Sequence, residues 1–145
     1  MKRVSVCALA LTVVLLSCTV TKSEVQQAET ETADAPIEVR VTAEQLYEDY
    51  EKNEISANLK YDDKILAVTG QVSGFGGGSE QAYYLDLSTG DAWATVRCHF
   101  SDARVEELTA LNRGDIVTLR GKGDEGKDRD PFTIDIIGCS VFEEE

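Results

Sequence analysis

The residues with the clearest chemistry lie near the start of the chain, where an apolar run ends in Leu-Leu-Ser-Cys at positions 15–18. Two basic residues precede this run, which is shorter than the roughly 20 apolar residues of a membrane-spanning helix. A basic start, a short apolar segment and a small residue before a cysteine are typical of a bacterial lipoprotein signal. The pattern predicts that residues 1–17 are removed and that the thiol of Cys18 is acylated. A plain secretory signal and a retained anchor helix are the alternatives.

Two further cysteines, Cys98 and Cys139, lie beyond the signal. An even number of thiols in a chain exported to an oxidising compartment favours a disulfide. Two buried free thiols are the alternative.

A second set of side chains could bind a ligand. Tyr84, Trp93 and Arg97 alternate with apolar residues at the period of β-strands, which predicts that they share an outer face with Thr69 and Gln71 of an earlier strand. The two aromatic rings could stack on a base, a sugar ring or a peptide side chain. The guanidinium of Arg97 could hold an anionic group through two hydrogen bonds.

Other polar groups favour plainer interpretations. His99 is the only histidine, and we expect an exposed strand residue rather than a metal ligand or a catalytic base. The glycine-rich stretch 74–78 has neither the following helix nor the lysine of a phosphate-binding loop, so we expect a flexible loop. The carboxylates of Asp124, Glu125, Asp128 and Asp130 lack the EF-hand spacing and are expected to be solvated. No cofactor and no metal are predicted.

Acidic residues dominate the composition. The 145-residue chain has a formal net charge of −13, and removal of the two basic residues of the signal would make it −15. Nucleic-acid binding depends on Lys and Arg that neutralise phosphates, so this balance makes a nucleic-acid partner unlikely on physical grounds. High negative charge more simply keeps a protein soluble and holds it away from anionic membrane surfaces.

The chain after the signal divides into a tail and one domain. Residues 18–37 are rich in Thr, Glu, Ala and Gln with almost no bulky apolar side chain, which predicts the lipidated cysteine followed by a flexible acidic tether. Residues 38–145 then form the folded domain. Its first helix is expected to begin after Thr42, with Gln45 completing a capping box, and to end near Lys52. An irregular connection follows over residues 53–64.

The rest of the domain has the pattern of an all-β core with a short helix. Alternating apolar residues predict five strands, at residues 66–72, 82–87, 92–100, 116–121 and 132–142. A short helix is expected after Ser101, between the third and the fourth strand. Three strands, a helix and two strands match the five-stranded Greek-key barrel called the OB-fold, here preceded by an N-terminal helix. Trp93 has an alternative role in such a fold, because it could pack under that helix beside Leu46 and Tyr50.

The third and fifth strands are neighbours in this barrel. Cys98 would face inward on the third strand, and a bulge near residues 136–138 would turn Cys139 inward on the fifth. The two thiols could then approach each other across the strand pair.

From residue 53 onward the chain resembles the tRNA-anti-like family of OB-fold proteins, many of which are small predicted lipoproteins. The matching pieces are Asn53-Glu54, Ala57, Lys60-Tyr61, Val68-Thr69-Gly70, Cys98-His99-Phe100, Gly114-Asp115-Ile116-Val117, Leu119, Gly121 and Gly138-Cys139. The resemblance extends over roughly residues 40–142. It implies an OB-fold and supplies no catalytic residue.

Together these patterns predict a protein of the bacterial cell envelope, held on the non-cytoplasmic side of a membrane by its N-terminal lipid. We expect its OB-fold to be a non-catalytic binding module, since no acid–base pair and no activated nucleophile is recognisable. The expected ligand is an unidentified envelope protein, peptide or glycan. The alternative is single-stranded nucleic acid or a nucleotide, which OB-folds commonly bind.

Overall fold

A computed structural model describes residues 35–78, 81–124 and 130–143 of the chain. The predicted signal, Cys18 and nearly all of the predicted tether lie outside the described residues. The elements, in chain order, are β1 (Val39–Thr42), α2 (Ala43–Lys52), α3 (Glu54–Tyr61), β2 (Ile65–Gly78), β3 (Gln81–Ser88), β4 (Thr95–Phe100), the 3₁₀ turn η1 (Asp102–Arg104), α4 (Val105–Thr109), β5 (Ile116–Gly123) and β6 (Thr133–Val141). Within the described residues, no helix is long and apolar enough to cross a membrane.

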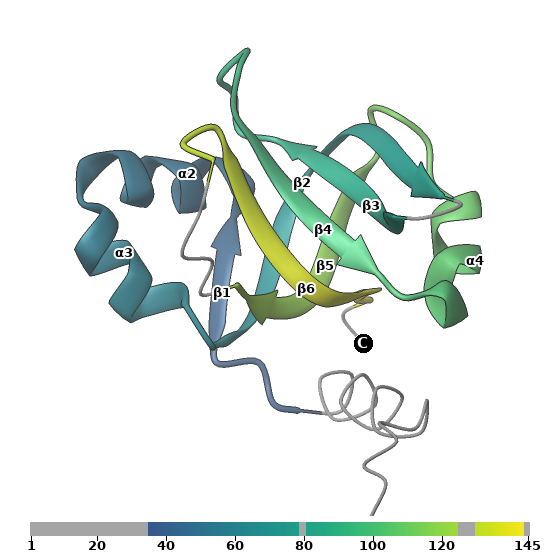
Figure 1. Ribbon diagram of the computed structural model, residues 1–145, viewed down its shortest axis with the longest axis horizontal. Coiled ribbons are helices and arrows are strands. Elements are labelled where there is room, and N and C mark those ends of the chain that lie inside the picture. The colour runs from purple at the N-terminus through teal and green to yellow at the C-terminus, as the bar shows by residue number, and fades with distance from the viewer. Residues whose placement is uncertain (1–34, 79–80, 125–129, 144–145) are drawn as a thin grey trace, which may run out of the picture.

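The strands close into a barrel, which confirms the predicted fold class (Figure 1). The sheet order is β1-β2-β3-β4-β6-β5, and a further pairing of β2 with β5 closes the ring. The predicted neighbours β4 and β6 run parallel, while β2–β3, β3–β4, β5–β6 and β2–β5 are antiparallel. The sequence analysis missed β1, which pairs in parallel with the first half of β2 along the edge that β3 leaves unpaired.

The glycine-rich stretch is part of a strand, so the prediction of a flexible loop was wrong. β2 continues through Gly78 and pairs with β3 as far as Gln81. The reason is steric, because the ring of Tyr84 lies across the backbone at Gly76. A β-carbon on Gly76 would sit 2.2 Å from the Tyr84 hydroxyl oxygen. Glycine therefore lets the Tyr84 ring pack flat on the neighbouring strand.

The N-terminal helix begins where it was predicted, and a second helix follows that was not. The Thr42 hydroxyl accepts the Gln45 backbone N–H at 3.1 Å, but the Gln45 side chain donates to Asp49 instead of completing a capping box. Residues predicted as an irregular connection form α3, because the Asn53 side chain accepts the Ser56 N–H at 3.1 Å. This cap starts a short helix that the weak apolar pattern alone did not indicate.

Asp49 connects the two helices. Its carboxylate accepts hydrogen bonds from Lys60 Nζ at 2.8 Å, Tyr61 Oη at 2.5 Å and Gln45 Nε2 at 2.8 Å. The bond from Lys60, followed by that from Tyr61, lowers the pKa of Asp49 from its ordinary value of 3.8 to about 2. The ionised carboxylate therefore stabilises the packing of α3 against α2.

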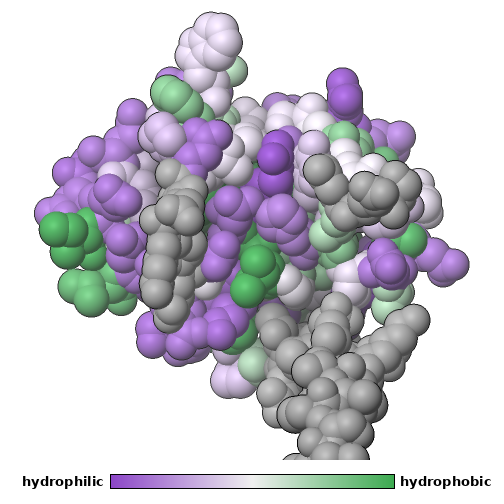
Figure 2. Space-filling model, viewed as in Figure 1, coloured by the Kyte–Doolittle hydropathy of each residue, from purple (hydrophilic) through white to green (hydrophobic). Residues whose placement is uncertain are grey.

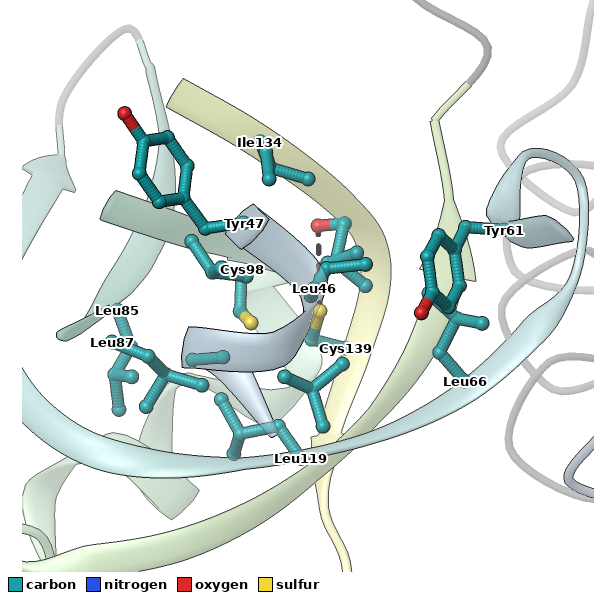
Figure 3. Close-up of a cluster of buried hydrophobic side chains, with 14 of the residues drawn as sticks. Leu46, Tyr47, Tyr61, Leu66, Leu85, Leu87, Cys98, Leu119, Ile134 and Cys139 are labelled. Carbon is teal, nitrogen blue, oxygen red and sulfur yellow. Dashed lines mark hydrogen bonds between the residues drawn. The ribbon is translucent and has the colours of Figure 1, made fainter. Parts of the chain in front are cut away.

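Helix α2 also fills one end of the barrel (Figure 3). Leu46 points from α2 into a cluster with Leu85, Leu87 and Cys98 of the barrel wall. Tyr47 packs at the edge of this core with its ring turned away from the leucines, and Tyr61 of α3 packs beside Leu66. Gly70 permits this approach, since a β-carbon there would lie 3.0 Å from the Ala43 β-carbon. One continuous apolar core thus holds the helices and the barrel together.

The bulge predicted in the last strand is present. The register of β6 against β5 shifts by one residue between the pairs Lys122–Ile137 and Arg120–Ser140, and Gly138 has φ +62°. A glycine in this conformation is the usual start of a bulge that bends the strand. The shift moves Ile137 to the outside and buries Cys139.

Cys98 and Cys139 are both buried and both free thiols, so the expected disulfide is absent here. The Cys139 thiol donates to the Ile136 carbonyl at 3.3 Å. Burial, followed by the nearby Cys98 thiol, raises the pKa of Cys139 well above its ordinary value. The two thiols lie close together in the core, as predicted, and their oxidation to a disulfide stays a prediction.

Gly121 faces the bulge, and its replacement tests how tightly the barrel closes. A β-carbon at this position would lie 2.6 Å from Ile136 Cγ2 and 2.7 Å from Cys139 Sγ. We expect Gly121→Ala to lower the free energy of unfolding by about 1–3 kcal/mol, the usual cost of overpacking a core. Urea unfolding followed by circular dichroism measures the change. The matched control is Gly74→Ala, where the nearest atom would be 3.9 Å away and the change should be small; equal effects would contradict the argument.

Asp49 predicts a specific dependence of stability on pH. A carboxyl whose pKa is lower in the folded state contributes stability above its unfolded pKa of 3.8 and loses it as the pH falls toward about 2. Asp49→Asn should therefore destabilise the protein by about 1–2 kcal/mol at pH 7. The difference from the wild type should shrink between pH 4 and pH 2, as measured by denaturant unfolding at each pH. A difference that stays constant down to pH 2 would contradict this role of the charge.

Candidate functional site

The outer face of β3, β4 and β6 carries a row of charged side chains. The register places Asp86 beside Arg97, and Arg97 beside Asp135. The three residues therefore form a row across three adjacent strands. Tyr84 and His99 form the next pair along β3 and β4. The sequence analysis placed Tyr84 and Arg97 on this face, and it did not identify Asp135.

Arg97 is already bound within the protein. Its Nε donates to Asp86 Oδ1 at 2.9 Å and its Nη2 to Asp86 Oδ2 at 3.1 Å. The guanidinium carbon also lies 4.1 Å from the centre of the Tyr84 ring. The bond to Asp86 raises the pKa of Arg97 above its ordinary value. The two-pronged contact predicted for a ligand is therefore made by Asp86.

The other two polar groups of this face are also engaged. The Tyr84 ring packs on Gly76 and beside Arg97, so it is half-buried rather than an open stacking platform. His99 shares a hydrogen bond of 2.7 Å with Asp135, and its ring centre is 6.3 Å from that of Tyr84. His99 is half-buried and paired, where the sequence analysis expected an exposed strand residue.

Trp93 lies in the loop between β3 and β4. The sequence analysis placed this residue in the third strand. This loop projects beyond the end of the barrel (Figure 1). The Trp93 backbone N–H donates to Asp91 Oδ1 at 2.7 Å, and its side chain is 83% exposed. The alternative in which Trp93 packs under the N-terminal helix is therefore wrong, because Leu46 and Tyr47 fill that space.

Trp93 and Tyr84 do not form one stacking site. Tyr84 pairs with His99, six residues from Trp93 along the chain. At about 3.3 Å per residue in a strand, this separates the two by roughly 20 Å. They could contact the same ligand only if it were an extended molecule.

Thr69 and Gln71 lie on another part of the barrel, where β2 pairs with β5. The Thr69 hydroxyl is 2.8 Å from that of Thr118, and Gln71 Nε2 donates to the Gly114 carbonyl at 3.2 Å. Both side chains therefore stabilise the β2–β5 pairing and do not join the row around Arg97.

A groove that the sequence analysis missed lies between α2, the start of α3 and the start of β6. It has a volume of about 330 Å³ and is lined by Tyr47, Tyr50, Glu51, Glu54, Asp130, Pro131, Thr133 and Ile134. Its residues come from two distant parts of the sequence. Only the i, i+3 spacing of Tyr47 and Tyr50 could have suggested an aromatic helix face.

Several large apolar side chains are exposed around the helices and this end of the barrel. Ile55 and Leu59, one turn apart on α3, are 75% and 81% exposed, and Phe132 before β6 is 51% exposed. Figure 2 shows hydrophobic atoms at the edge of the molecule where α3 lies. Surface exposure of this kind is typical of contact regions when it is contiguous.

The described part of the acidic loop forms no cluster of metal ligands. Within residues 35–78, 81–124 and 130–143, no three His, Cys, Asp or Glu side chains lie close enough to hold a metal ion. Glu125 and Asp128, which belong to the predicted solvated run, lie outside the described residues.

The closed barrel, with its helix between the third and fourth barrel strands, defines an OB-fold protein. More specifically, the family described as tRNA_anti-like matches residues 1–133, and the chain belongs to that family. The curated proteins include no match.

Solved structures support the fold. One is the crystal structure of a "putative nucleic acid-binding lipoprotein" from Klebsiella pneumoniae subsp. pneumoniae MGH 78578, with a TM-score of 0.58 and 16% identity over 71% of this chain and 91% of that one. More distant similarities, with TM-scores of 0.40 and 0.39, are to the OBody AM3L09 bound to hen egg-white lysozyme and to asparaginyl-tRNA synthetase of Entamoeba histolytica. The OBody has 16% identity over 59% of this chain and 88% of its own. The synthetase has 14% identity over 58% of this chain and 22% of its own. At 16% identity, the similarity to the Klebsiella structure shows the fold alone.

The bond between Arg97 and Asp86 should matter for stability. Its side chains are 31% and 18% exposed, and a bidentate, partly desolvated pair is stronger than a surface pair. We expect Asp86→Ala to lower the free energy of unfolding by about 1–3 kcal/mol, because Arg97 would keep its charge and lose its partner. The control is Glu48→Ala, which breaks the exposed pair with Lys52 and should cost no more than about 0.5 kcal/mol. Denaturant unfolding measures both, and an Asp86 effect as small as the control would refute the assignment.

Proposed function

We propose that this protein is a bacterial envelope lipoprotein, anchored through a lipid on Cys18, whose OB-fold is a non-catalytic module that binds a protein, peptide or glycan outside the membrane. The apolar run that ends in Leu-Leu-Ser-Cys supports the anchor. Membership of the tRNA_anti-like family supports a binding role, and the Klebsiella relative is also described as a lipoprotein.

The observation that carries the choice of ligand is the engagement of Arg97. OB-folds bind nucleic acid through a positively charged groove with aromatic stacking platforms. On the equivalent outer face of this chain, Arg97 is held by Asp86 and has Asp135 as its other neighbour. The face therefore carries two carboxylates for one guanidinium, and a phosphate would have to compete with their negative charge.

The charge of the whole chain also disfavours a nucleic-acid ligand. A formal net charge of −13 opposes the approach of a polyanion, whereas it does not oppose a neutral or cationic ligand. Trp93 offers an exposed aromatic contact surface that a protein, peptide or glycan could cover. These points favour such a ligand over the nucleic acid that the name of the Klebsiella relative mentions.

Crosslinking in living cells tests this proposal. A photoreactive amino acid at position 93 should capture a protein or glycan of the envelope, because the Trp93 side chain is exposed at the end of the barrel. The same amino acid at position 103, exposed at the opposite end of β4, is the control and should capture much less. Mass spectrometry identifies the product. A nucleic acid at position 93, or an identical set of products at both positions, would contradict the proposal.

A further inference from the structure

The groove between α2, α3 and β6 is distinct from the outer face around Arg97. The aromatic and apolar part of its lining comes from Tyr47 and Tyr50 of α2 and from Pro131 and Ile134 at the start of β6. A volume of about 330 Å³ is at the lower end of the range of ligand pockets. It suits one or two side chains rather than a whole cofactor.

The charged groups that line this groove are all acidic. Glu51, Glu54 and Asp130 contribute carboxylates, and no described basic side chain lines the groove. The pKa of Tyr47 is raised by burial, then by Glu51, and to a smaller degree by Asp91 of the β3–β4 loop. The groove therefore has a negative potential to which the neighbouring loop contributes.

The three carboxylates come from different segments, Glu51 from α2, Glu54 from α3 and Asp130 from the residues before β6. Glu51 accepts a hydrogen bond from Tyr47 at 3.2 Å, and Asp130 accepts the Phe132 backbone N–H at 3.1 Å. Among the described residues, no group of three acidic side chains could share a metal ion. Carboxylates from different segments suit contacts with several positions of an extended molecule.

Two exposed aromatic side chains, Phe132 and Trp93, stand outside the lining of the groove, in the segments that precede β6 and β4. The Phe132 carbonyl accepts the Thr95 N–H at 2.9 Å, which places Phe132 beside the start of β4. Trp93 lies two residues before that strand. Both rings are exposed, 51% for Phe132 and 83% for Trp93. An apolar residue of a partner could therefore be buried next to the acidic groove.

We propose that this groove binds an extended peptide segment of a partner protein, in which a lysine or arginine lies close to an apolar residue. The cation would meet Glu51 and Glu54, with its aliphatic stem along the parts of Tyr47 and Tyr50 that line the groove. The apolar residue would pack on Phe132 and Trp93. This inference rests on the proposed binding function and identifies the chemical class of its ligand.

A glycan fits the groove less well. Sugar rings stack on open aromatic faces, but Tyr47 is only 8% exposed and Tyr50 is half-buried with its hydroxyl bonded to Asp62 at 2.8 Å. Neutral sugars also have no charge for the carboxylates to pair with. A cationic peptide satisfies both features of the groove, its charge and its apolar lining.

Peptide titration of the full chain in detergent tests the inference. The probe is a nine-residue peptide of alternating lysine and leucine, and its partner control has glutamate in place of lysine. Trp93 is the only tryptophan of the chain, so its fluorescence reports a partner that covers it. We expect a blue shift that saturates with the lysine peptide and none with the glutamate peptide, at a salt concentration that screens long-range attraction.

Paired variants separate the groove from the general charge of the chain. Glu51→Gln with Glu54→Gln should weaken binding of the lysine peptide at least tenfold, since two charge-assisted contacts would be lost. The matched control, Glu44→Gln with Glu48→Gln, removes the same charge from α2 at positions that do not line the groove, and should change binding less than twofold. Circular dichroism checks that both pairs fold.

Three results would overturn the inference. They are equal weakening by both pairs, equal binding of both peptides, and a fluorescence shift produced by neutral oligosaccharides instead. If the groove pair did not fold, the comparison of the two peptides on the wild-type chain would still decide. Capture of an envelope protein at position 93 without any effect of the groove pair would reject this ligand class and leave the proposed binding function intact.

Discussion

The structure depends on closure of the barrel at β6, which pairs with β4 on one side and β5 on the other. If the side chains of β6 alternated strictly between inside and outside, the strand could not pair with both neighbours and still bury the apolar residues of its second half. The extra residue at Gly138 changes the parity, so that Ile136 and Cys139 both face the core. Gly121 on β5 leaves the space for them. The packing of the core beneath the second half of β6 follows from this bend.

The same register determines what the outer face can bind. Because β4 lies between β3 and β6, Arg97 has a carboxylate on each side, and Asp86 holds it with two hydrogen bonds. The scaffold is one that often binds nucleic acid, but its ligand is chosen by side chains and not by the fold. Here the basic group on this face is held by Asp86 and bridges two strands of the sheet.

Much of the fold could be predicted from the sequence, because alternation and glycine positions report directly on buried strand faces. The barrel, the β4–β6 neighbours and the inward turn of Cys139 followed from that signal. Features that depend on contacts between distant residues could not be predicted. The Asp135 partner of His99 lies 36 residues away, and the glycine-rich part of β2 pairs with β3, where Gly76 leaves space for the Tyr84 ring. Trp93 was misplaced because the alternation of apolar and polar residues begins before Thr95, where β4 starts.

Helix α2 belongs both to the core and to the lining of the acidic groove. One side of it fills the barrel through Leu46, while Tyr47 both packs against the core and lines the acidic groove. Asp49 on the same helix holds α3 in place, and α3 supplies Glu54 to the groove. The groove therefore exists only when the helices are docked on the barrel. A ligand that binds it binds the folded state alone, so it must raise the stability of the helix packing by mass action.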